Sequence, residues 1–221
     1  MDIVEELKKE SKRFNKIVVW GLRKRFHTHR YIYSSYYRIL KKVGVPVIWV
    51  EDKIQSQKLI EKNDLIISAE VIGKMVPEKL KFEDYNIPVR DDIYYCLHNF
   101  KEIFSEKINP EKLLKLQVYN NKAENYEKIY EGVHFDKKNK ILYQPWGTNL
   151  LPEEFNEPVF NRNKFIFWVG SVWNDKNMKE MISKVLSLNK NEYIGLVKKQ
   201  QEICKNYTYF QHLNNIFKAF R

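Results

Sequence analysis

Three residues that shape small or fibrous folds are scarce in this 221-residue chain, which has two cysteines, seven glycines and seven prolines. Cys96 and Cys204 stand far apart without CxxC spacing. The length of the chain excludes a disulfide-stapled miniprotein, and the cysteine spacing excludes a zinc knuckle and fits a reducing compartment. The glycines and prolines follow no collagen period and form no flexible linker or internal repeat, so we expect a globular fold.

Long apolar runs and the common nucleotide-binding fingerprints are absent as well. No run approaches the ~20 residues that cross a bilayer, and the acidic residues 1–6 are unlike a signal peptide, so a cytoplasmic protein is expected. The patterns GxGxxG, GxxxxGK[ST] and GxSxG do not occur in the chain. Their absence excludes the common dinucleotide-binding, P-loop and serine-hydrolase motifs.

What the chain has in abundance is positive charge in one segment. The net charge is +11, and residues 8–42 hold twelve Lys and Arg against Glu10 as the one acid, while the rest of the chain has 27 basic and 27 acidic residues. Such an excess either forms a solvated surface or attracts an anion: a nucleotide diphosphate, a phospholipid surface, an anionic glycan or nucleic acid. The 43% hydrophobic and 14% aromatic residues exclude intrinsic disorder.

The apolar pattern predicts alternating strands and helices. Helices are expected at residues 29–43 and 54–62, between strands at 17–20, 45–50 and 64–68. Further strands are expected at 93–97 and 114–119, followed by a hairpin of residues 132–135 and 140–143. An additional first helix follows the cap residue Asp2. This order is typical of an α/β fold with a Rossmann-like, mainly parallel sheet.

A proline-containing stretch after residue 150 is the one convincing linker. We therefore divide the chain into a Rossmann-like domain, residues 1–150, and a second part, residues 151–221. The second part contains one expected strand, 165–169, and three expected helices, 176–186, 192–204 and 209–220. These elements predict that the second part is a small α/β unit that looks incomplete.

Ligands of open α/β sheets bind beyond the carboxyl ends of the strands, and the residues expected there are unusually polar. The first such loop leads into a helix N-terminus, which favours a phosphate-bearing ligand, through the candidate anion-binding residues Arg23, Lys24, Arg25, His27 and Arg30. The other strand ends carry Asp52, His98, Thr148, Asn149, Gly170, Ser171 and Asn174. His27 and His29 lack a supporting acid or cysteine cluster, so no metal is expected. Trp146 lies in a polar loop, where it could face a sugar or a base.

The order of these motifs resembles bacterial and viral glycosyltransferases of the GT-B type. The matching segments are residues 20–32, 48–52, 97–99, 143–149 and 168–171, together with the ending 205–209, which is similar to the spore-maturation-protein-like group, whose chains close on a helix introduced by a Thr-Tyr pair. The resemblance touches most of the first 150 residues. It implies two Rossmann-like domains, an acceptor-side one first and a donor-side one second, with no obligatory metal or other cofactor.

The resemblance also assigns roles to residues. Gly170 and Ser171, with Asn174 close by, would contact the diphosphate of a nucleotide-sugar donor, and Thr148 and Asn149 would form the floor of a cleft. The acceptor would be a glycan or a lipid-linked glycan, and the basic segment would orient an anionic substrate or hold the enzyme at the inner face of an anionic membrane. If the enzyme inverts configuration, a base must take the acceptor proton, and the candidates are His98, His29 and Asp52.

Two other classes stay open. A non-catalytic or degenerate scaffold of the same fold is one, because a complete donor domain needs about 100 to 150 residues, whereas about 70 follow Leu151. Either the donor domain is shortened, or a segment after Ser183 is missing. A basic nucleic-acid-binding module is the other, with phosphates bound by Lys and Arg and bases stacked on Tyr31, Tyr33, Tyr36 and Tyr37. The core positions predicted for this helix argue against nucleic acid as a partner.

Overall fold

A computed structural model of the chain describes residues 2–21, 23, 28–51, 57–69, 88–98, 108–117, 127–130, 133–158, 183–184 and 186–221. These residues form two compact units. Unit 1 consists of Met1–Asn149 and Tyr207–Arg221, and unit 2 consists of Leu150–Asn206. The division after Asn149 lies next to the boundary drawn from the sequence, but the closing helix, which the sequence analysis placed with the second part, belongs to unit 1.

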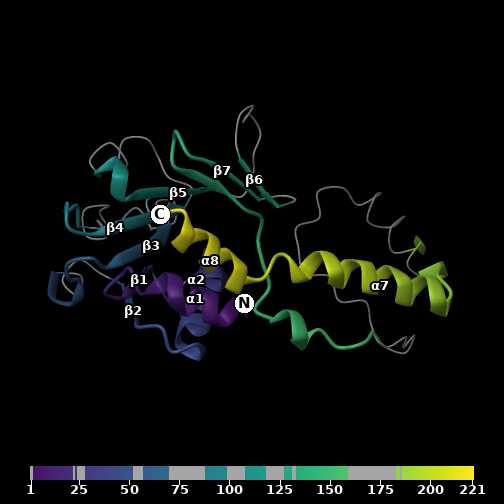
Figure 1. Cartoon of the computed structure of the whole chain (residues 1–221). Coiled ribbons are helices and arrows are strands. Elements are labelled where there is room, and N and C mark those ends of the chain that lie inside the picture. Colours follow the sequence, from purple (N-terminus) through teal and green to yellow (C-terminus); the bar gives the residue numbers. More distant parts are fainter. Residues whose placement is uncertain are drawn as a thin grey trace, which may run out of the picture. The chain divides into compact units, whose positions relative to one another are not determined.

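Unit 1 is built on one eight-stranded sheet with the order β2-β1-β3-β4-β5-β8-β7-β6 (Figure 1). The strands are β1 (Ile17–Trp20), β2 (Val47–Val50), β3 (Leu65–Ala69), β4 (Tyr94–His98), β5 (Leu113–Gln117), β6 (Glu127–Tyr130), β7 (Val133–Asp136) and β8 (Ile141–Tyr143). Neighbouring strands from β2 through β8 are parallel, and β8, β7 and β6 pair antiparallel. The predicted Rossmann-like α/β fold with a mainly parallel sheet is confirmed.

The parallel strands follow the doubly wound order 2-1-3-4-5, in which the direction of winding reverses between β1 and β3. The sequence explains their formation, because β1 is the run Ile-Val-Val-Trp with every residue buried. β-branched residues fit a strand that is covered on both faces. The hairpin β7–β8 was also predicted, whereas the strand β6, whose sequence is Glu-Lys-Ile-Tyr, was not.

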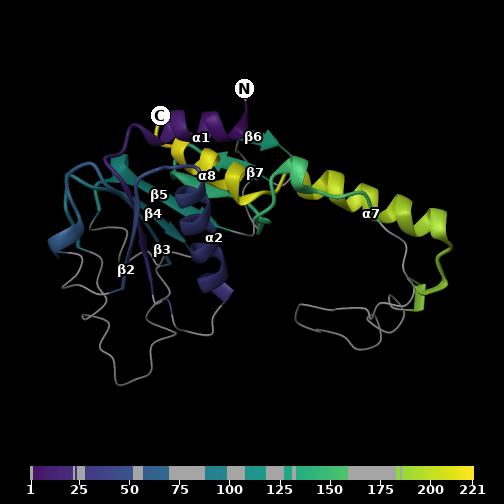
Figure 2. The same cartoon turned by 90° about the horizontal axis from the view of Figure 1, so that it is seen from below.

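Three helices cover one face of this sheet: α1 (Ile3–Ser11), α2 (Thr28–Lys42) and α8 (Tyr209–Lys218) (Figures 1 and 2). Helix α1 begins at the predicted cap, because the Asp2 carboxylate accepts a hydrogen bond from the Val4 N–H. Helix α2 begins at Thr28, one residue earlier than predicted, and Gly44 follows it with φ 76°. Thr208 caps α8 by accepting from the Gln211 N–H.

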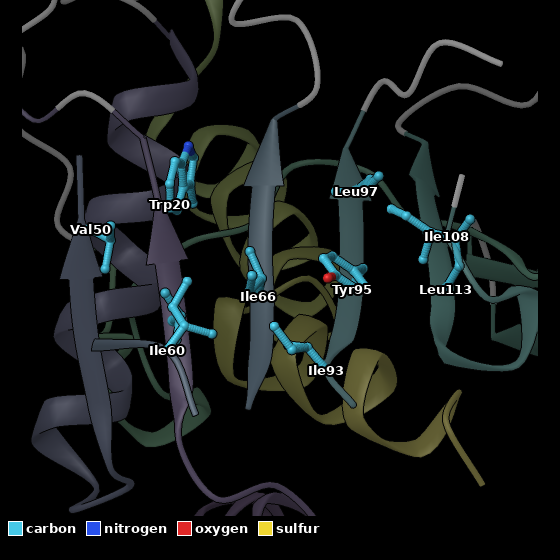
Figure 3. Close-up of a cluster of buried hydrophobic side chains, with 10 residues drawn as sticks. Trp20, Val50, Ile60, Ile66, Ile93, Tyr95, Leu97, Ile108 and Leu113 are labelled. Atoms are coloured by element: carbon cyan, nitrogen blue, oxygen red, sulfur yellow. The ribbon is translucent and has the colours of Figure 1, made fainter. Parts of the chain in front are cut away.

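The opposite face of the sheet carries a hydrophobic cluster. Figure 3 shows its side chains on the side of the sheet away from the helices. The members with the largest side chains are Trp20, Tyr95, Ile66, Leu97 and Leu113 in the strands, and Ile60, Ile93 and Ile108 in the segments between them. Trp20 and Leu97 lie near the carboxyl ends of their strands, and Ile93 lies just before β4. The cluster therefore extends along the parallel strands, from their amino ends to their carboxyl ends.

The closing segment returns to unit 1 at Gly147 and Thr148. The Thr148 N–H donates to the Tyr207 carbonyl at 2.9 Å, and the Tyr209 N–H donates to the Thr148 carbonyl at 2.8 Å. A Cβ on Gly147 would lie 2.6 Å from the Tyr207 carbonyl oxygen, so only glycine permits this approach. The residues of unit 2 are thus inserted in sequence between two segments that are bonded within unit 1.

Unit 2 is described by its own helix, α7 (Lys190–Lys205), and by a 3₁₀ turn at Pro152–Glu154. Asn189 caps α7 together with Glu192, a reciprocal capping box. Helix α7 contains no buried residue, and Gln201 and Lys198 bond to Asn156 and Glu157 of the same unit. The strand predicted at 165–169 and most of the helix predicted at 176–186 lie outside the described residues.

Candidate functional site at the carboxyl edge of the sheet

The carboxyl ends of the parallel strands meet at one edge of unit 1, where ligands of this fold class bind. The register places Trp20 beside Val50 and Ser68, and Ala69 beside His98. Two polar residues lie at this edge, Ser68 near the end of β3 and His98 at the end of β4. Both are almost completely buried. The carboxyl edge is therefore the candidate site.

The first corner of the edge is built by the ends of β1 and β2. The Gly21 N–H donates to the Val50 carbonyl at 3.1 Å, and the Trp49 indole N–H donates to the Gly21 carbonyl at 2.6 Å. The Arg23 N–H donates to a Glu51 carboxylate oxygen at 2.7 Å. These bonds hold the chain as it leaves β1.

Arg23 presents its guanidinium at this corner. The side chain is exposed, and its central carbon lies 5.1 Å from the Trp49 ring and 5.4 Å from the Tyr37 ring. Cation–π contacts of this kind orient a guanidinium and leave its N–H donors available. Of the five predicted anion-binding residues, Arg23 is thus the one whose side chain the structure places, and its position suits an anion.

The other predicted anion-binding residues are less fully described. Arg30 and the candidate base His29 lie in the first turn of α2, where the structure describes their backbone. Lys24, Arg25 and His27 lie outside the described residues, as does the candidate base Asp52. The predicted donor-binding residues Gly170, Ser171 and Asn174 also lie outside them, so the structure places none of the three.

His98 is the candidate base that the structure places best. It ends β4 with 1% of its surface exposed, and its ring lies 4.9 Å from the Trp146 ring in an edge-to-face contact at 77°. Trp146 follows β8 and is 36% exposed. The pair therefore combines a buried imidazole with a partly exposed aromatic ring that lies against it.

Thr148 and Asn149, which the resemblance assigns to the floor of a cleft, lie at the return of the closing segment. Both backbone polar groups of Thr148 bond to Tyr207 and Tyr209, and Asn149 is exposed. Thr148 is thus used to hold α8 on unit 1. The cleft itself is not described.

A buried polar chain connects α8 to the end of β8, and sequence reasoning missed it. The Gln211 side-chain amide donates to the Asn215 side chain at 3.2 Å, and the Asn215 amide donates to Gln144 at 3.3 Å. Gln144 and Asn215 are each 3% exposed. The available signal was the i, i+4 spacing of Gln211 and Asn215, which places the two side chains on one face of the helix.

His212 follows Gln211, the first residue of this buried polar chain, and is 1% exposed. Its ring packs edge-to-face on Tyr209 at 5.3 Å, and Tyr209 in turn packs on Tyr36 at 5.4 Å. Burial lowers the pKa of His212 to about 3, because the charged imidazolium would lose its hydration. Burial likewise raises the pKa of the Cys96 thiol and of the Tyr33 and Tyr36 hydroxyls, so this cluster is neutral at physiological pH.

The basic segment 8–42 is partly neutralised by ion pairs within unit 1. Lys8 pairs with Glu5 at 2.8 Å, Arg13 pairs with Glu10 at 3.2 Å, and Lys16 pairs with Asp64 at 3.0 Å. These cations lie on α1 or before β1, away from the carboxyl edge. The positive charge relevant to a ligand is therefore that of the loop after β1, which begins with Arg23.

The burial of two tyrosines argues against base stacking on α2. Tyr33 and Tyr36 are 3% and 1% exposed, whereas Tyr31 is 61% exposed. A buried ring cannot stack on a nucleobase, so Tyr33 and Tyr36 cannot contribute to the platform that the nucleic-acid interpretation requires.

The described part of the chain lacks two features. It contains no group of three or more His, Cys, Asp or Glu side chains that could hold a metal ion. None of its helices combines the length and the apolar composition that a bilayer-spanning segment needs.

Comparison of the chain with models of protein families, with curated proteins and with solved structures finds no match.

Proposed function

We propose that this chain is a glycosyltransferase-like protein that transfers a sugar from a nucleotide-sugar donor to a hydroxyl of a glycan or lipid-linked acceptor. The observation that carries the proposal is the contact of His98 with Trp146 at the carboxyl edge of a doubly wound sheet. An imidazole is the commonest general base in enzymes, and a partly exposed indole offers a flat apolar surface to a sugar ring.

The reaction assigns a role to each group. The acceptor oxygen attacks the anomeric carbon, its proton passes to His98, and the bond from that carbon to the diphosphate breaks with the electrons leaving on the diphosphate. Because His98 is 1% exposed and Trp146 packs against it, we expect acceptor binding to displace the Trp146 ring. Arg23 and the N-terminus of α2 supply positive charge for the leaving group.

The return of the closing helix to unit 1 supports the same proposal. Thr208 and Tyr209 are the Thr-Tyr pair on which the resemblance to the spore-maturation-protein-like group depends, and Thr208 caps α8. The donor-side roles of Gly170, Ser171 and Asn174 remain part of the proposal. So does association of the basic segment with an anionic membrane surface.

The first test is a thermal-shift panel of UDP, GDP, CMP and short oligonucleotides at two salt concentrations, followed by mass analysis of transfer from the matching nucleotide-sugar. Stabilisation by one nucleotide is expected, since binding to the native state raises stability by mass action. Nucleotide binding with no transfer to any acceptor tested would favour the scaffold interpretation. Steeply salt-dependent oligonucleotide binding would favour the nucleic-acid one.

The second test is the variant His98→Asn, with His134→Asn as a matched control. We expect a loss of transfer by about 10²- to 10⁴-fold, the range typical of general bases, with nucleotide affinity retained. His134 lies in β7, on the antiparallel side of the sheet, so its variant should transfer like the parent. Equal rates for the parent and His98→Asn would refute the assignment of the base.

A further inference from the structure

Trp20 carries a buried hydrogen-bond donor at the carboxyl end of β1. Its side chain is 0% exposed, and its indole N–H has no hydrogen-bond partner among the residues that the structure describes. Buried donors are nearly always paired, because an unpaired one loses its hydration without compensation. This donor therefore requires an explanation.

Trp49 on the neighbouring strand β2 shows the usual arrangement, in which an indole N–H has a hydrogen-bond acceptor. Its indole N–H donates to the Gly21 carbonyl at 2.6 Å. Trp20 precedes Gly21 and lies on the other face of the sheet, in the hydrophobic cluster. Figure 3 shows its indole nitrogen at the end of the ring that lies toward the carboxyl edge. The unpaired donor is thus directed at the edge where ligands of this fold class bind.

The position of Trp20 coincides with the reversal of winding in the sheet. Trp20 pairs in register with Ser68 of β3, and β1 and β3 are the two strands between which the direction of winding changes. In doubly wound sheets, ligands bind beyond the carboxyl ends of the strands at such a reversal. Ser68 is fully buried as well.

The charge that follows Trp20 indicates which ligand fits. Arg23, whose side chain is exposed, follows the end of β1, and the 15-residue helix α2 begins at Thr28. A helix N-terminus and an exposed guanidinium both favour an oxyanion.

We propose that the carboxyl end of β1 binds a phosphate-bearing ligand and that the Trp20 indole N–H donates a hydrogen bond to one of its phosphate oxygens. This inference depends on the proposed function only for the source of the phosphate, which is either the diphosphate of the donor or a phosphate of the acceptor. The binding is measured without transfer, so a chain that binds phosphate and fails every transfer assay, or the reverse, separates the two proposals.

The probe is inorganic pyrophosphate, titrated at low salt and at matched ionic strength into the parent, Trp20→Phe and Tyr95→Phe. Trp20→Phe keeps an aromatic ring and removes the N–H. Tyr95 belongs to the same hydrophobic cluster, but its hydroxyl donates to the Pro88 carbonyl at 2.6 Å, before the start of β4. We expect at least a tenfold loss of pyrophosphate affinity in Trp20→Phe and none in Tyr95→Phe.

A nuclear magnetic resonance titration of the parent keeps the test valid if Trp20→Phe folds poorly. The indole N–H signal of Trp20 should move as pyrophosphate is added, whereas that of Trp49, which has a partner in the protein, should move less. UDP and pyrophosphate of equal affinity would indicate the acceptor phosphate, and a strong preference for one nucleotide would indicate the donor. An unchanged Trp20 signal, unchanged affinity in Trp20→Phe, or no pyrophosphate binding by the parent would overturn the proposal.

Discussion

In unit 1 the parallel strands begin at one edge of the sheet, the amino edge, and end at the other, the carboxyl edge. The two edges differ in whether their buried polar groups have hydrogen-bond partners. At the amino edge, Asp64 is fully buried and accepts hydrogen bonds from the Asn15 side chain at 2.9 Å and from the Glu61 N–H at 2.7 Å, besides its ion pair with Lys16. At the carboxyl edge, the Trp20 and Gln144 side chains each keep an N–H group, and His212 a ring nitrogen, without a partner among the described residues.

Charges show the same difference. Arg90, which precedes β4, donates two parallel hydrogen bonds to Asp92 at 2.8 and 2.7 Å, and this contact lowers the pKa of Asp92. Burial alone would lower the pKa of Lys16, but its hydrogen bonds with Glu61 and Asp64 raise it above the ordinary value. At the carboxyl edge the Arg23 guanidinium contacts the rings of Tyr37 and Trp49, and it is the backbone N–H of Arg23 that has a carboxylate partner, Glu51. The amino edge is thus arranged for stability, and the carboxyl edge retains unused polar capacity, as expected of a binding edge.

The largest expected effect is at the amino edge. Replacing Asp64 by Ala should lower the free energy of unfolding by about 3 to 5 kcal/mol, because Lys16, Asn15 and the Glu61 N–H lose their common buried partner. Urea denaturation measures the change. Glu5→Gln breaks the exposed pair with Lys8 and should cost at most about 1 kcal/mol. Equal stabilities of the two variants would mean that Asp64 contributes no more to stability than an exposed ion pair does.

The sequence predicts the strands better than it predicts this buried network. Residues 17–20, 47–50 and 65–69 are short runs rich in β-branched residues, which suit strands covered on both faces. Asp64 could be placed at the start of a strand, but its burial depends on Asn15 and Lys16, which are 49 and 48 residues away. Periodicity contains no information on such distant pairs.

The candidate site was predictable to a similar degree. The position of His98 at a strand end followed from the pattern 93–97, and the strand-to-helix junction after β1 identified Arg23. The contact of His98 with Trp146, the buried chain from Gln144 to Gln211, and the unpaired Trp20 N–H all depend on packing between distant segments. The polar strand β6 was missed because Glu127 and Lys128 give it no apolar alternation.

A second prediction concerns the return of the chain at the carboxyl edge. Gly147→Ala should lower the free energy of unfolding by about 2 to 3 kcal/mol, since its Cβ would lie 2.6 Å from the Tyr207 carbonyl oxygen and 3.0 Å from the His212 ring. Gly195→Ala is the matched control, because a Cβ at this position of α7 meets nothing within 4 Å. The control should be neutral or stabilising by up to about 1 kcal/mol, as alanine is the better helix former.

Thermal and urea unfolding of both glycine variants decide this point. Destabilisation of Gly147→Ala with loss of hydrogen-exchange protection in α8 would place the effect at the return segment. If Gly147→Ala unfolds like the parent, the carboxyl edge is more adaptable than the close approach of Tyr207 indicates.

The smallest expected effect is the pH dependence of the free energy of unfolding, which should differ between His212 at the carboxyl edge and Asp92 at the amino edge. The pKa of His212 is lowered to about 3 in the folded chain, against about 6.5 when unfolded, so between these values the unfolded chain binds one more proton. Stability is therefore complete above pH 6.5 and falls by about 1.4 kcal/mol for each unit of pH below it, or about 2 kcal/mol at pH 5. The lowered pKa of Asp92 at the amino edge acts only at lower pH, near and below the ordinary value of 3.8. Urea denaturation of the parent and of His212→Leu from pH 7 to pH 5 should show a slope in the parent that the variant loses. Equal slopes would mean that His212 binds its proton as readily in the folded chain as in the unfolded one.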